Sequence, residues 1–527
     1  MLFITINCFF LIRSGRRKLY PLIFLEEQIS KTKVPVLFWE NSIGRDKTCD
    51  IIIPDLSVSR NHAVLKRREE GWFICDTDSK SGVLLNGKKV KREEVVAVGD
   101  ILSFGQASFA LIKNEENLNK KRSFASSPFG LLLSCNIMFL LMAIDCAYKN
   151  TNPNYIPFIS FGCLFALSFL LYFYSIKILK RVNFEIETLA VALSGSGIML
   201  LSGINLRLPL VQIAALFLGM FLFCFMMKLI SNADVMGSLR IVFEIIAICL
   251  FLLTVIFGTV VNGAQNWIYI GSYSIQPSEF IKIAFVFAGA STLHQLQKHT
   301  NLLEFIIFSL ICTAFLIYMH DFGSAIIFFF AFLIISFMRS GSIRTVFLAL
   351  SASLLGVFIV LRFKPYIADR FAGWGKVWEH PYDLGYQQTR VLTYSADGGL
   401  LGLGIGKGYL KNVFAGESDL IFGMLCEELG IIFALTVAFA FVILCYCALS
   451  NASISRSAFY SISSCAAAGL LLFQAAINIF GVTDIMPLTG VTLPFISAGG
   501  SSMVAVWGLL AFIKACDEKT WGVRRGK

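Results

Sequence analysis

The sequence is poor in charge and contains no cysteine pattern of the metal-binding kind. Only 15% of its 527 residues are Asp, Glu, Lys or Arg, whereas 56% are apolar. A soluble protein of this length needs more polar surface, so a polytopic membrane protein is expected. The 14 cysteines include no CxxC pair and lie mostly in apolar runs, which excludes a zinc module and an exported disulfide framework.

The positive charge is not gathered on one basic face. A formal net charge of +11 is by itself compatible with nucleic-acid binding. The Lys and Arg residues instead fall in the N-terminal region and in short gaps between apolar runs, without interleaved aromatics. This distribution is typical of the cytoplasmic loops of a membrane protein, and it predicts no nucleic-acid partner.

The first 18 residues form a short apolar and basic segment. Residues 1–12 are apolar but too few to cross a bilayer, and the positive charge follows them at 13–18. A cleaved signal peptide carries its positive charge ahead of the apolar stretch, so none is predicted.

Residues 19–113 differ in character from everything that follows. Short β-rich runs alternate with Gly, Asn, Asp and Ser turns, and Asn86-Gly87 is a strong hairpin signal. We therefore expect an all-β sandwich here, followed by a hydrophilic linker at 114–127. The predicted strands include 19–25, 50–53, 62–66, 71–75 and 109–112.

From Ser127 onward the sequence contains about twelve apolar segments of roughly bilayer-spanning length. If the N-terminus is cytoplasmic, positive charge is expected in or beside the gaps on the cytoplasmic side and in the tail at 516–527. It is found there, at Lys177, Lys180, Arg181, Lys228, Arg240, Lys298, Arg339, Arg344, Arg456, Arg524, Arg525 and Lys527. The same alternation places the loops 262–276, 363–418 and 483–495 on the outer face, where they are predicted to line one site. The segments lie at 129–148, 155–179, 187–206, 208–230, 238–261, 277–294, 302–319, 321–339, 343–362, 419–449, 462–482 and 496–515.

The β-rich domain carries Gly44-Arg45, Ser59-Arg60-Asn61-His62 and Asn86-Gly87 in its loops. In combination this spacing resembles the forkhead-associated (FHA) domain, a reader of phosphothreonine peptides, over about the whole of 19–113. The chemistry agrees, because a guanidinium fork pairs with phosphate oxygens and a hydroxyl donates a further hydrogen bond.

The resemblance implies roles for individual FHA loop residues. Arg45 and Ser59 would hold the phosphate, Arg60 and Lys80 would lie in the same phosphothreonine-binding site, and His62 would brace the loop. The family usually has Thr-Asn where this chain has Lys80-Ser81. Lys80 would add charge attraction there, whereas the contacts of the missing Asn amide to the peptide backbone are not implied.

The membrane region contains several polar and glycine-rich motifs in order along the chain. They are Gly-Ala-Gln-Asn-Trp-Ile at 263–268, Gln-Pro-Ser-Glu-Phe-Ile-Lys at 276–282, Asp-Phe-Gly-Ser-Ala at 321–325, Gly-Tyr-Gln at 385–387, Gly-Gly-Leu at 398–400, Glu-Glu-Leu-Gly at 427–430 and Leu-Pro-Phe-Ile-Ser-Ala-Gly-Gly-Ser-Ser at 493–502. In this order they resemble the FtsW/RodA/SpoVE family, also called SEDS proteins, over about residues 187–515. The resemblance implies a helical core of ten spans, preceded by two extra spans within 128–186.

Membership of this family would make the protein a peptidoglycan glycosyltransferase. Such an enzyme polymerises lipid II in the bacterial cell membrane, beside a class B penicillin-binding transpeptidase, in cell division or cell-shape maintenance. The N-terminal domain and the C-terminus would be cytoplasmic, and a phosphothreonine-containing protein would regulate the enzyme. A divalent cation, Mg²⁺ or Mn²⁺, is implied by the family alone. The alternatives are a flippase for the lipid-linked precursor and a non-catalytic FHA scaffold.

The attacking sugar hydroxyl needs a base within hydrogen-bond reach. The family's functional Asp lies a few residues before Gly-Tyr-Gln and is usually followed by Pro. Without a gap this position is His380, and with a short deletion it is Asp383. Asp383 is favoured because an ionised carboxylate suits both a base and a cation ligand, while His380 and Glu379 stay as candidates.

Other polar residues of the membrane region have two explanations each. Glu279 and Lys282 lie three apart on one helix face, so they either neutralise each other or handle the substrate. Trp267 is either an interface anchor or part of the site wall. Asp321, Glu427 and Glu428 are expected to be structural. The side chains predicted to bind substrate are Trp267, Glu279, Lys282, Tyr386, Gln387 and Ser497.

Overall fold

The computed structural model describes most of the chain, in the ranges given at the end of this paragraph. The predicted linker 114–127, the part of the outer insertion at 363–373 and the tail from 518 lie outside the described residues. The predicted span 343–362 also lies outside them, apart from a few positions. The described ranges are 1–14, 21–38, 40–47, 49–68, 71–91, 93–113, 128–148, 155–179, 181, 183–231, 233–261, 263–271, 273–291, 299–340, 343–344, 346–347, 350–351, 374–453, 455 and 457–517.

The N-terminal domain is a sandwich of two sheets, which confirms the prediction. One sheet has the order β2-β1-β11-β10-β7-β8 and the other β4-β3-β5-β6-β9. The pairs are antiparallel except β3 with β4. The strands are β1 Ile23–Glu27, β2 Lys33–Val36, β3 Glu40–Gly44, β4 Ile51–Ile52, β5 Ala63–Arg68, β6 Gly71–Asp76, β7 Val83–Leu85, β8 Lys88–Lys89, β9 Glu93–Val96, β10 Ile101–Phe104 and β11 Ala107–Lys113.

The two sheets pack against each other through every second side chain of their strands. Along β11, Ala107, Phe109 and Leu111 point into the core, and the residues between them are only partly buried. This period of two is what a half-buried strand requires. Asn86 and Gly87 both have positive φ, 47° and 81°, and they join the paired strands β7 and β8. The predicted hairpin turn is therefore confirmed.

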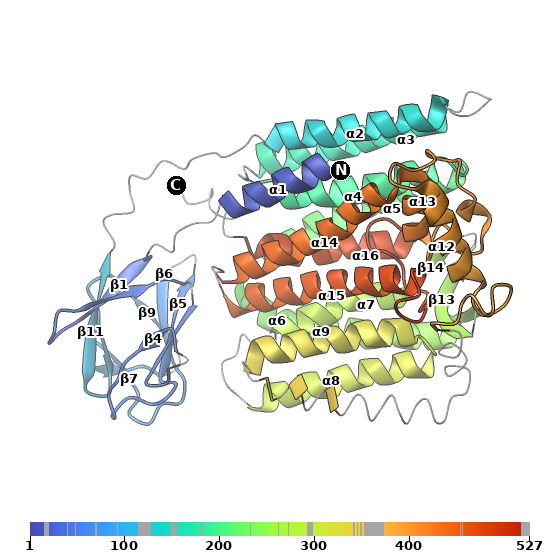
Figure 1. Cartoon of the computed structure of the whole chain (residues 1–527). Coiled ribbons are helices and arrows are strands. Elements are labelled where there is room, and N and C mark those ends of the chain that lie inside the picture. Colours follow the sequence, from blue (N-terminus) through green and yellow to red (C-terminus); the bar gives the residue numbers. More distant parts are fainter. Residues whose placement is uncertain are drawn as a thin grey trace.

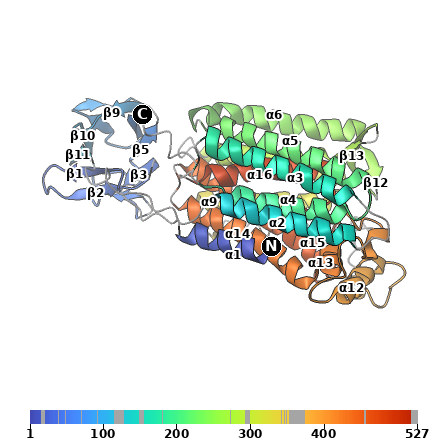
Figure 2. The ribbon, with the colours of Figure 1, turned by 90° about the horizontal axis from the view of Figure 1, so that it is seen from above.

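The rest of the chain is a bundle of helices that lie roughly alongside one another (Figures 1 and 2). Among the described helices, 6 are long and apolar enough to cross a membrane, and shorter apolar helices lie beside them. The predicted polytopic helical fold is confirmed. The helices are α1 Leu2–Ser14, α2 Pro128–Tyr148, α3 Ile156–Tyr172 with its continuation η2 Phe173–Ile178, α4 Glu185–Leu201, α5 Arg207–Leu229, α6 Ala233–Phe257, α7 Pro277–Ser291, α8 His299–Tyr318, α9 Phe322–Ser340, α12 Tyr386–Gly398, η3 Leu410–Asn412, α13 Ile421–Leu429, α14 Ile431–Ala452, α15 Ala458–Val482 and α16 Gly500–Ala515.

Each predicted span except 343–362 coincides with described helix. For one of them, however, the prediction of a single continuous helix was wrong. The stretch 419–449 is two helices, α13 and α14, which are separated at Gly430. Gly430 has φ 84°, and a Cβ there would lie 2.3 Å from the carbonyl oxygen of Leu400. The break therefore needs glycine, because an L side chain rarely takes this conformation and would also collide with Leu400.

Two further segments have secondary structure that was not predicted. The outer loop 262–276 contains the strands β13 Ala264–Ile270 and β14 Tyr273–Ile275, which form a three-stranded sheet with β12 Thr259–Val261 just before the loop. The apolar segment at the start of the chain forms α1, which packs against α14, α4 and α2. Contact with these helices covers apolar surface on a segment that is too short to span.

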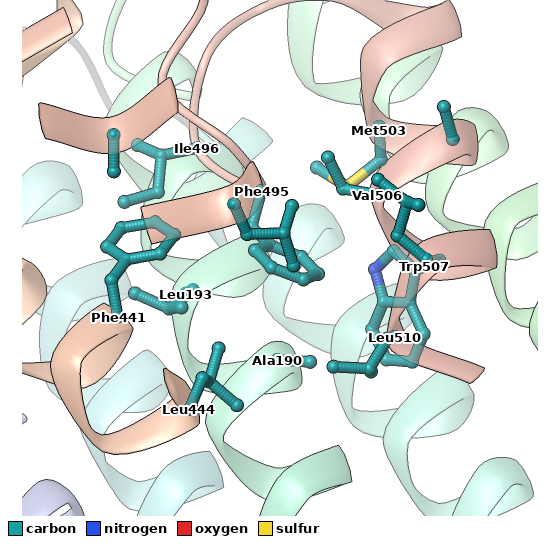
Figure 3. Packing of buried hydrophobic residues seen from close by; sticks show 14 of the residues in the cluster. Ala190, Leu193, Phe441, Leu444, Phe495, Ile496, Met503, Val506, Trp507 and Leu510 are labelled. Atoms are coloured by element: carbon teal, nitrogen blue, oxygen red, sulfur yellow. The ribbon is translucent and has the colours of Figure 1, made fainter. Parts of the chain in front are cut away.

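The centre of the bundle is formed by α4, α15 and α16, whose residues are largely buried. Trp507 of α16 packs edge-to-face with Phe495, at a centroid distance of 6.3 Å, and its indole N–H donates to the Ser194 hydroxyl at 3.1 Å. Figure 3 shows Trp507 and Phe495 among side chains from α4 and α14. On the other side of α4, the Phe139 ring lies directly over Gly195, so the extra helix α2 packs tightly on the core.

The two ends of the bundle differ. The β-sandwich lies beside one end, where the Glu40 carboxylate accepts a hydrogen bond from the Ala458 amide at the start of α15. The segments β13, β14, α12 and α13 gather at the opposite end (Figure 1). We call this opposite end, with residues 259–276, 374–430 and 483–499, the loop end.

A buried ionic cluster joins the start of α4 to the end of α16. The Lys514 ammonium donates to the Glu187 carboxylate at 2.9 Å, and to the carbonyl and side-chain oxygens of Asn183 at 3.0 Å each. Arg181 lies 4.0 Å from the same carboxylate. Glu187 and Lys514 are both fully buried, so each depends on the other for charge compensation.

We expect Lys514→Ala to destabilise the protein by about 3 kcal/mol, because Glu187 would keep its buried charge with only the more distant Arg181 beside it. Thermal unfolding in detergent measures the loss. The control is Glu304→Ala, which breaks a half-exposed ion pair with Arg240 and should cost less than about 1 kcal/mol. Equal losses in the two variants would contradict this assignment.

Candidate functional site

Hydrogen bonds hold the three predicted outer loops at the loop end, two of them directly to each other and the first to the start of α16. The Trp374 indole donates to the Ile485 carbonyl at 3.2 Å, and the Ala498 amide donates to the Glu417 carbonyl at 2.9 Å. The first outer loop is tied in where the Gln276 amide donates to the Ser501 hydroxyl at 3.3 Å. Segments more than 200 residues apart in sequence therefore meet at one end of the bundle.

The three candidate bases lie together in the turns that precede α12. Asp383, His380 and Glu379 are all exposed. The amide of Asp383 donates to the His380 carbonyl at 3.3 Å, and the Tyr386 amide donates to the Asp383 carbonyl at 3.1 Å. Asp383 is thus the candidate nearest the first turn of α12, and its carboxylate is open to a ligand.

Helix α12 carries two of the predicted substrate-binding residues. Gln387 donates from its side chain to the Phe414 carbonyl at 3.0 Å, which fixes α12 against the following loop. Tyr386 is 38% exposed, and the Arg390 guanidinium lies 5.4 Å from the centre of its ring. A cation–π contact of this kind holds the positive charge one turn from the start of the helix.

The first outer loop is organised around Asp321 at the start of α9. Its carboxylate accepts hydrogen bonds from the side chains of Asn266, Gln276 and Ser324, at 3.1, 3.3 and 2.9 Å. Trp267, the neighbour of Asn266 on β13, is partly buried. This geometry agrees with the expected structural role of Asp321, which orients the strand that presents Trp267.

Glu279 and Lys282 lie in the first two turns of α7 and are both buried. The Lys282 ammonium donates to the Glu279 carboxylate at 2.6 Å and to the Gln474 side-chain oxygen at 2.9 Å. The other carboxylate oxygen, Oε2 of Glu279, has no protein partner. Mutual neutralisation is therefore visible in the structure, and substrate handling by this pair stays a prediction.

Ser497 is buried between two loops. Its hydroxyl donates to the Ser418 carbonyl at 2.6 Å and accepts from the Leu493 amide at 2.8 Å. The Ser497 carbonyl accepts from the Gln212 side chain at 2.6 Å. These bonds hold the loop before α16 in place, while the predicted contact of Ser497 with substrate stays a prediction.

The segment 401–411, which we call the glycine loop, belongs to the predicted outer loop 363–418, but its partners were not predicted from the sequence. Glu427 accepts from the amides of Tyr409 and Leu410 at 2.6 and 3.0 Å, and Glu428 accepts from those of Gly406 and Gly408 at 2.8 and 3.3 Å. The two carboxylates are structural, as expected, but their target was not foreseen. The available signal was a glycine run followed about twenty residues later by two adjacent acids.

Burial changes the protonation of both carboxyl groups. Loss of solvent raises the pKa of Glu428 to about 7, and the neighbouring charge of Glu427 acts in the same direction. Burial also raises the pKa of Glu427, although the two amides that it accepts from oppose the shift. Glu428 therefore takes up a proton near neutral pH.

In the β-sandwich, the predicted phosphate-binding residues lie on adjoining loops. The Ser59 hydroxyl accepts from the Lys80 amide at 3.0 Å, so its own hydrogen is free to donate to a ligand. Arg45, Arg60 and Lys80 are exposed. His62 is buried; its Nδ1 accepts from the Ser59 amide at 3.0 Å and its Nε2 lies 3.1 Å from the Gly82 carbonyl oxygen. That is the bracing geometry predicted for His62.

A family model of cell cycle proteins, FtsW/RodA/SpoVE, matches residues 188–520. The chain belongs to the FtsW/RodA/SpoVE family. A model of the FHA domain matches residues 41–105, within the β-sandwich. Both resemblances drawn from the sequence motifs are thereby confirmed, and α1, α2 and α3 lie outside the part that the FtsW/RodA/SpoVE model covers.

Curated relatives within this family match about half of this chain. A probable peptidoglycan glycosyltransferase FtsW from Wigglesworthia glossinidia brevipalpis is 33% identical over 280 residues, or 51% of this chain and 74% of the relative. Stage V sporulation protein E of Bacillus subtilis is 33% identical over 271 residues, which are 49% of this chain and 74% of the relative. A solved chain from a peptidoglycan synthase complex shares the fold, with a TM-score of 0.52 at 23% identity over 63% of this chain and 96% of the other.

The raised pKa of Glu428 implies that the stability of the folded protein depends on pH. The folded protein holds this proton up to about pH 7, whereas the unfolded chain releases it near pH 4.5, so stability from this group falls as the pH rises through that window. We expect wild-type protein in detergent to lose thermal stability from pH 5 to pH 8, and Glu428→Gln to lose less. Glu417→Gln is the control, and an unchanged pH dependence in Glu428→Gln would refute the assignment.

Proposed function

We propose that this protein is a peptidoglycan glycosyltransferase of the bacterial cell membrane that polymerises lipid II at the loop end. The observation that carries the proposal is the match of residues 188–520 to the FtsW/RodA/SpoVE family, together with the exposed Asp383 where the outer loops meet. The relatives named as glycosyltransferases support the reaction class.

Asp383 is the proposed general base. Its carboxylate lies in the turns that lead into α12, a stretch fixed at Trp374 by Ile485 and at Gln387 by Phe414. An ionised carboxylate in this position can accept the proton of the sugar hydroxyl that attacks the anomeric carbon of a second lipid II. Because the carboxylate is exposed and its backbone is held, it reaches a substrate without rearrangement of the fold.

The departing diphosphate develops negative charge that a nearby cation stabilises. Arg390 is placed for this role, because its guanidinium is held over Tyr386 on the helix that follows Asp383. The polyprenyl chains of lipid II need apolar surroundings, and apolar helix surface borders the loop end on the membrane side. Substrate and product can therefore stay in the membrane during polymerisation.

A divalent cation fits the site only with help from the substrate. Among the described residues, no group of three or more His, Cys, Asp or Glu could hold a metal ion. Mg²⁺ is commonly held by one or two carboxylates plus substrate phosphates, and Asp383 is the carboxylate available for that. When bound, the cation would neutralise the diphosphate, and no step above depends on it.

The proposal also states which side of the membrane each part faces and which proteins it would bind. The β-sandwich and the C-terminus would face the cytoplasm and the loop end the outer face, because Lys or Arg lies in or beside each of the short gaps on the sandwich side. A class B penicillin-binding transpeptidase would use the glycan product. A phosphothreonine-containing protein would bind the FHA loops at Arg45, Ser59, Arg60 and Lys80.

We expect Asp383→Asn to lower lipid II polymerisation by about 10²-fold or more, because the amide cannot take up the proton. Purified protein and labelled lipid II, with product length read on gels, measure the rate. His380→Ala and Glu379→Ala are matched controls from the same turns and should stay within about threefold of wild type. If Asp383→Asn keeps its activity and His380→Ala or Glu379→Ala loses it, the base is reassigned.

The same assay separates the other functions. A wild-type protein that moves labelled lipid II across vesicle membranes without polymer would be a transporter. A protein that does neither would be a scaffold, and both results would refute the proposal.

We expect Arg45→Ala to weaken binding of phosphothreonine peptides by about tenfold or more, because a charge-assisted bidentate contact is lost. A peptide library screened on the full-length protein supplies the ligand, and titration gives the affinity. Lys33→Ala, on the edge strand β2, is the control. Unchanged affinity in Arg45→Ala would show that this loop does not bind phosphate.

A further inference from the structure

The backbone of the glycine loop has many accessible conformations, so groups outside the loop must hold it in one of them. Gly402, Gly404 and Gly406 have φ of 82°, 103° and 80°, which other residues rarely adopt. Such a glycine-rich segment has many accessible backbone states, so ordering it costs more than ordering an ordinary loop. Its position therefore depends on the hydrogen bonds that its amides make.

Acceptors outside the loop take up most of these amides. Leu403 and Gly404 donate to the carbonyls of Glu427 and Glu428, both at 2.9 Å. The side chains of the same two acids accept from Gly406, Gly408, Tyr409 and Leu410, as described above. The amide between the two sets belongs to Ile405, and it donates to Oδ2 of Asp145 at 3.0 Å.

Asp145 comes from a different part of the molecule than the other acceptors. It lies in the last turn of α2, one of the extra helices before the family-matched region 188–520. Helix α2 is also the first helix after the β-sandwich. A helix that the family core does not include thus contacts the glycine loop directly.

The glycine loop packs on the core through the buried side chain of Ile405, and it borders an open pocket on the side of α2. A cavity of about 450 Å³ lies between α1, α2 and the loop, and its walls include Asp145, Ile405 and Glu428. Where side chains leave such a space, fewer van der Waals contacts hold the backbone. Beside this pocket, the hydrogen bond from Ile405 to Asp145 links the glycine loop to α2.

The glycine loop in turn contacts the helix of the proposed site. The ring of Tyr409 lies 5.7 Å from that of Tyr394 on α12. The loop residues that follow reach Phe414, whose carbonyl accepts from Gln387 in the first turn of α12. The glycine loop and the residues after it are therefore in contact with the helix that follows Asp383.

We propose that Asp145 is a positioning residue for glycan polymerisation, which fixes the glycine loop, and through it α12, from the extra helix α2. This inference rests on the proposed function for its catalytic consequence. By this proposal, the extra helix α2 contributes to catalysis and does not only connect the β-sandwich to the core.

The test compares Asp145→Ala with Asp145→Asn in lipid II polymerisation by the full-length protein. Asp145→Ala should lower kcat by about tenfold or more with KM within about twofold, because a displaced catalytic group slows the chemical step more than binding. Asp145→Asn should stay within about threefold of wild type, since its amide oxygen still accepts from Ile405. The control is Ser134→Ala, on the same helix and cavity wall, whose hydroxyl bonds only to Gly130 of its own helix.

Two results would overturn the proposal. Wild-type kcat in Asp145→Ala would show that the bond is dispensable, and equal losses in Asp145→Asn and Asp145→Ala would assign the effect to charge. Hydrogen exchange of the glycine loop gives a readout without activity. Exchange at residues 403–410 should be faster in Asp145→Ala and near wild type in Asp145→Asn.

The exchange measurement also separates this proposal from the proposed function. If the wild-type protein makes no polymer, the glycosyltransferase assignment fails, and the catalytic role of Asp145 fails with it. Unchanged exchange in Asp145→Ala would instead refute the positioning of the loop by Asp145, whatever the activity.

Discussion

The structure depends on the pairing of polar groups that are buried among apolar helices. A charge or an amide removed from water costs several kcal/mol unless it has a partner. Lys514 of α16 meets this requirement with Glu187 of α4, and Lys282 of α7 meets it with Glu279 of the same helix and Gln474 of α15. The bonds from Lys514 to Glu187 and from Lys282 to Gln474 also join different helices.

The same requirement shapes the loop end. Asp321 collects three side chains from the first outer loop and its own helix, and Glu427 and Glu428 collect four amides of the glycine loop. Carboxylates that bind protein groups in this way stabilise the surroundings of the site. The exposed carboxylate of Asp383 differs from them, and this contrast supports its assignment as the group that meets substrate.

Sequence patterns predicted the elements that depend on local chemistry. The apolar segments, the Asn86-Gly87 hairpin and the bracing role of His62 follow from composition, turn propensity and motif resemblance. The break at Gly430 was missed, because apolar residues on both sides continue without a gap and only the approach of Leu400 requires glycine. The sheet β12–β14 was also missed, since its short strands are stabilised by one another and by adjoining helices.

Contacts between distant residues could not be predicted from one sequence. Nothing in the order of residues shows that Asp145 meets Ile405, 260 positions away, or that Glu427 and Glu428 hold the glycine loop. Motif resemblance reduced the candidates for the base to Asp383, His380 and Glu379. Exposure does not distinguish them, because all three are exposed in the same turns.

The central claim is that the outer loops converge on one face of the membrane, opposite the β-sandwich. The most direct test is labelling of the variants Trp267→Cys, Tyr386→Cys and Ser59→Cys by a membrane-impermeant thiol reagent in intact cells, against the background of the parent protein. The account predicts that the Trp267→Cys and Tyr386→Cys variants react from outside and that the Ser59→Cys variant reacts only after permeabilisation. Reaction of the first two variants from opposite sides of the membrane would contradict it.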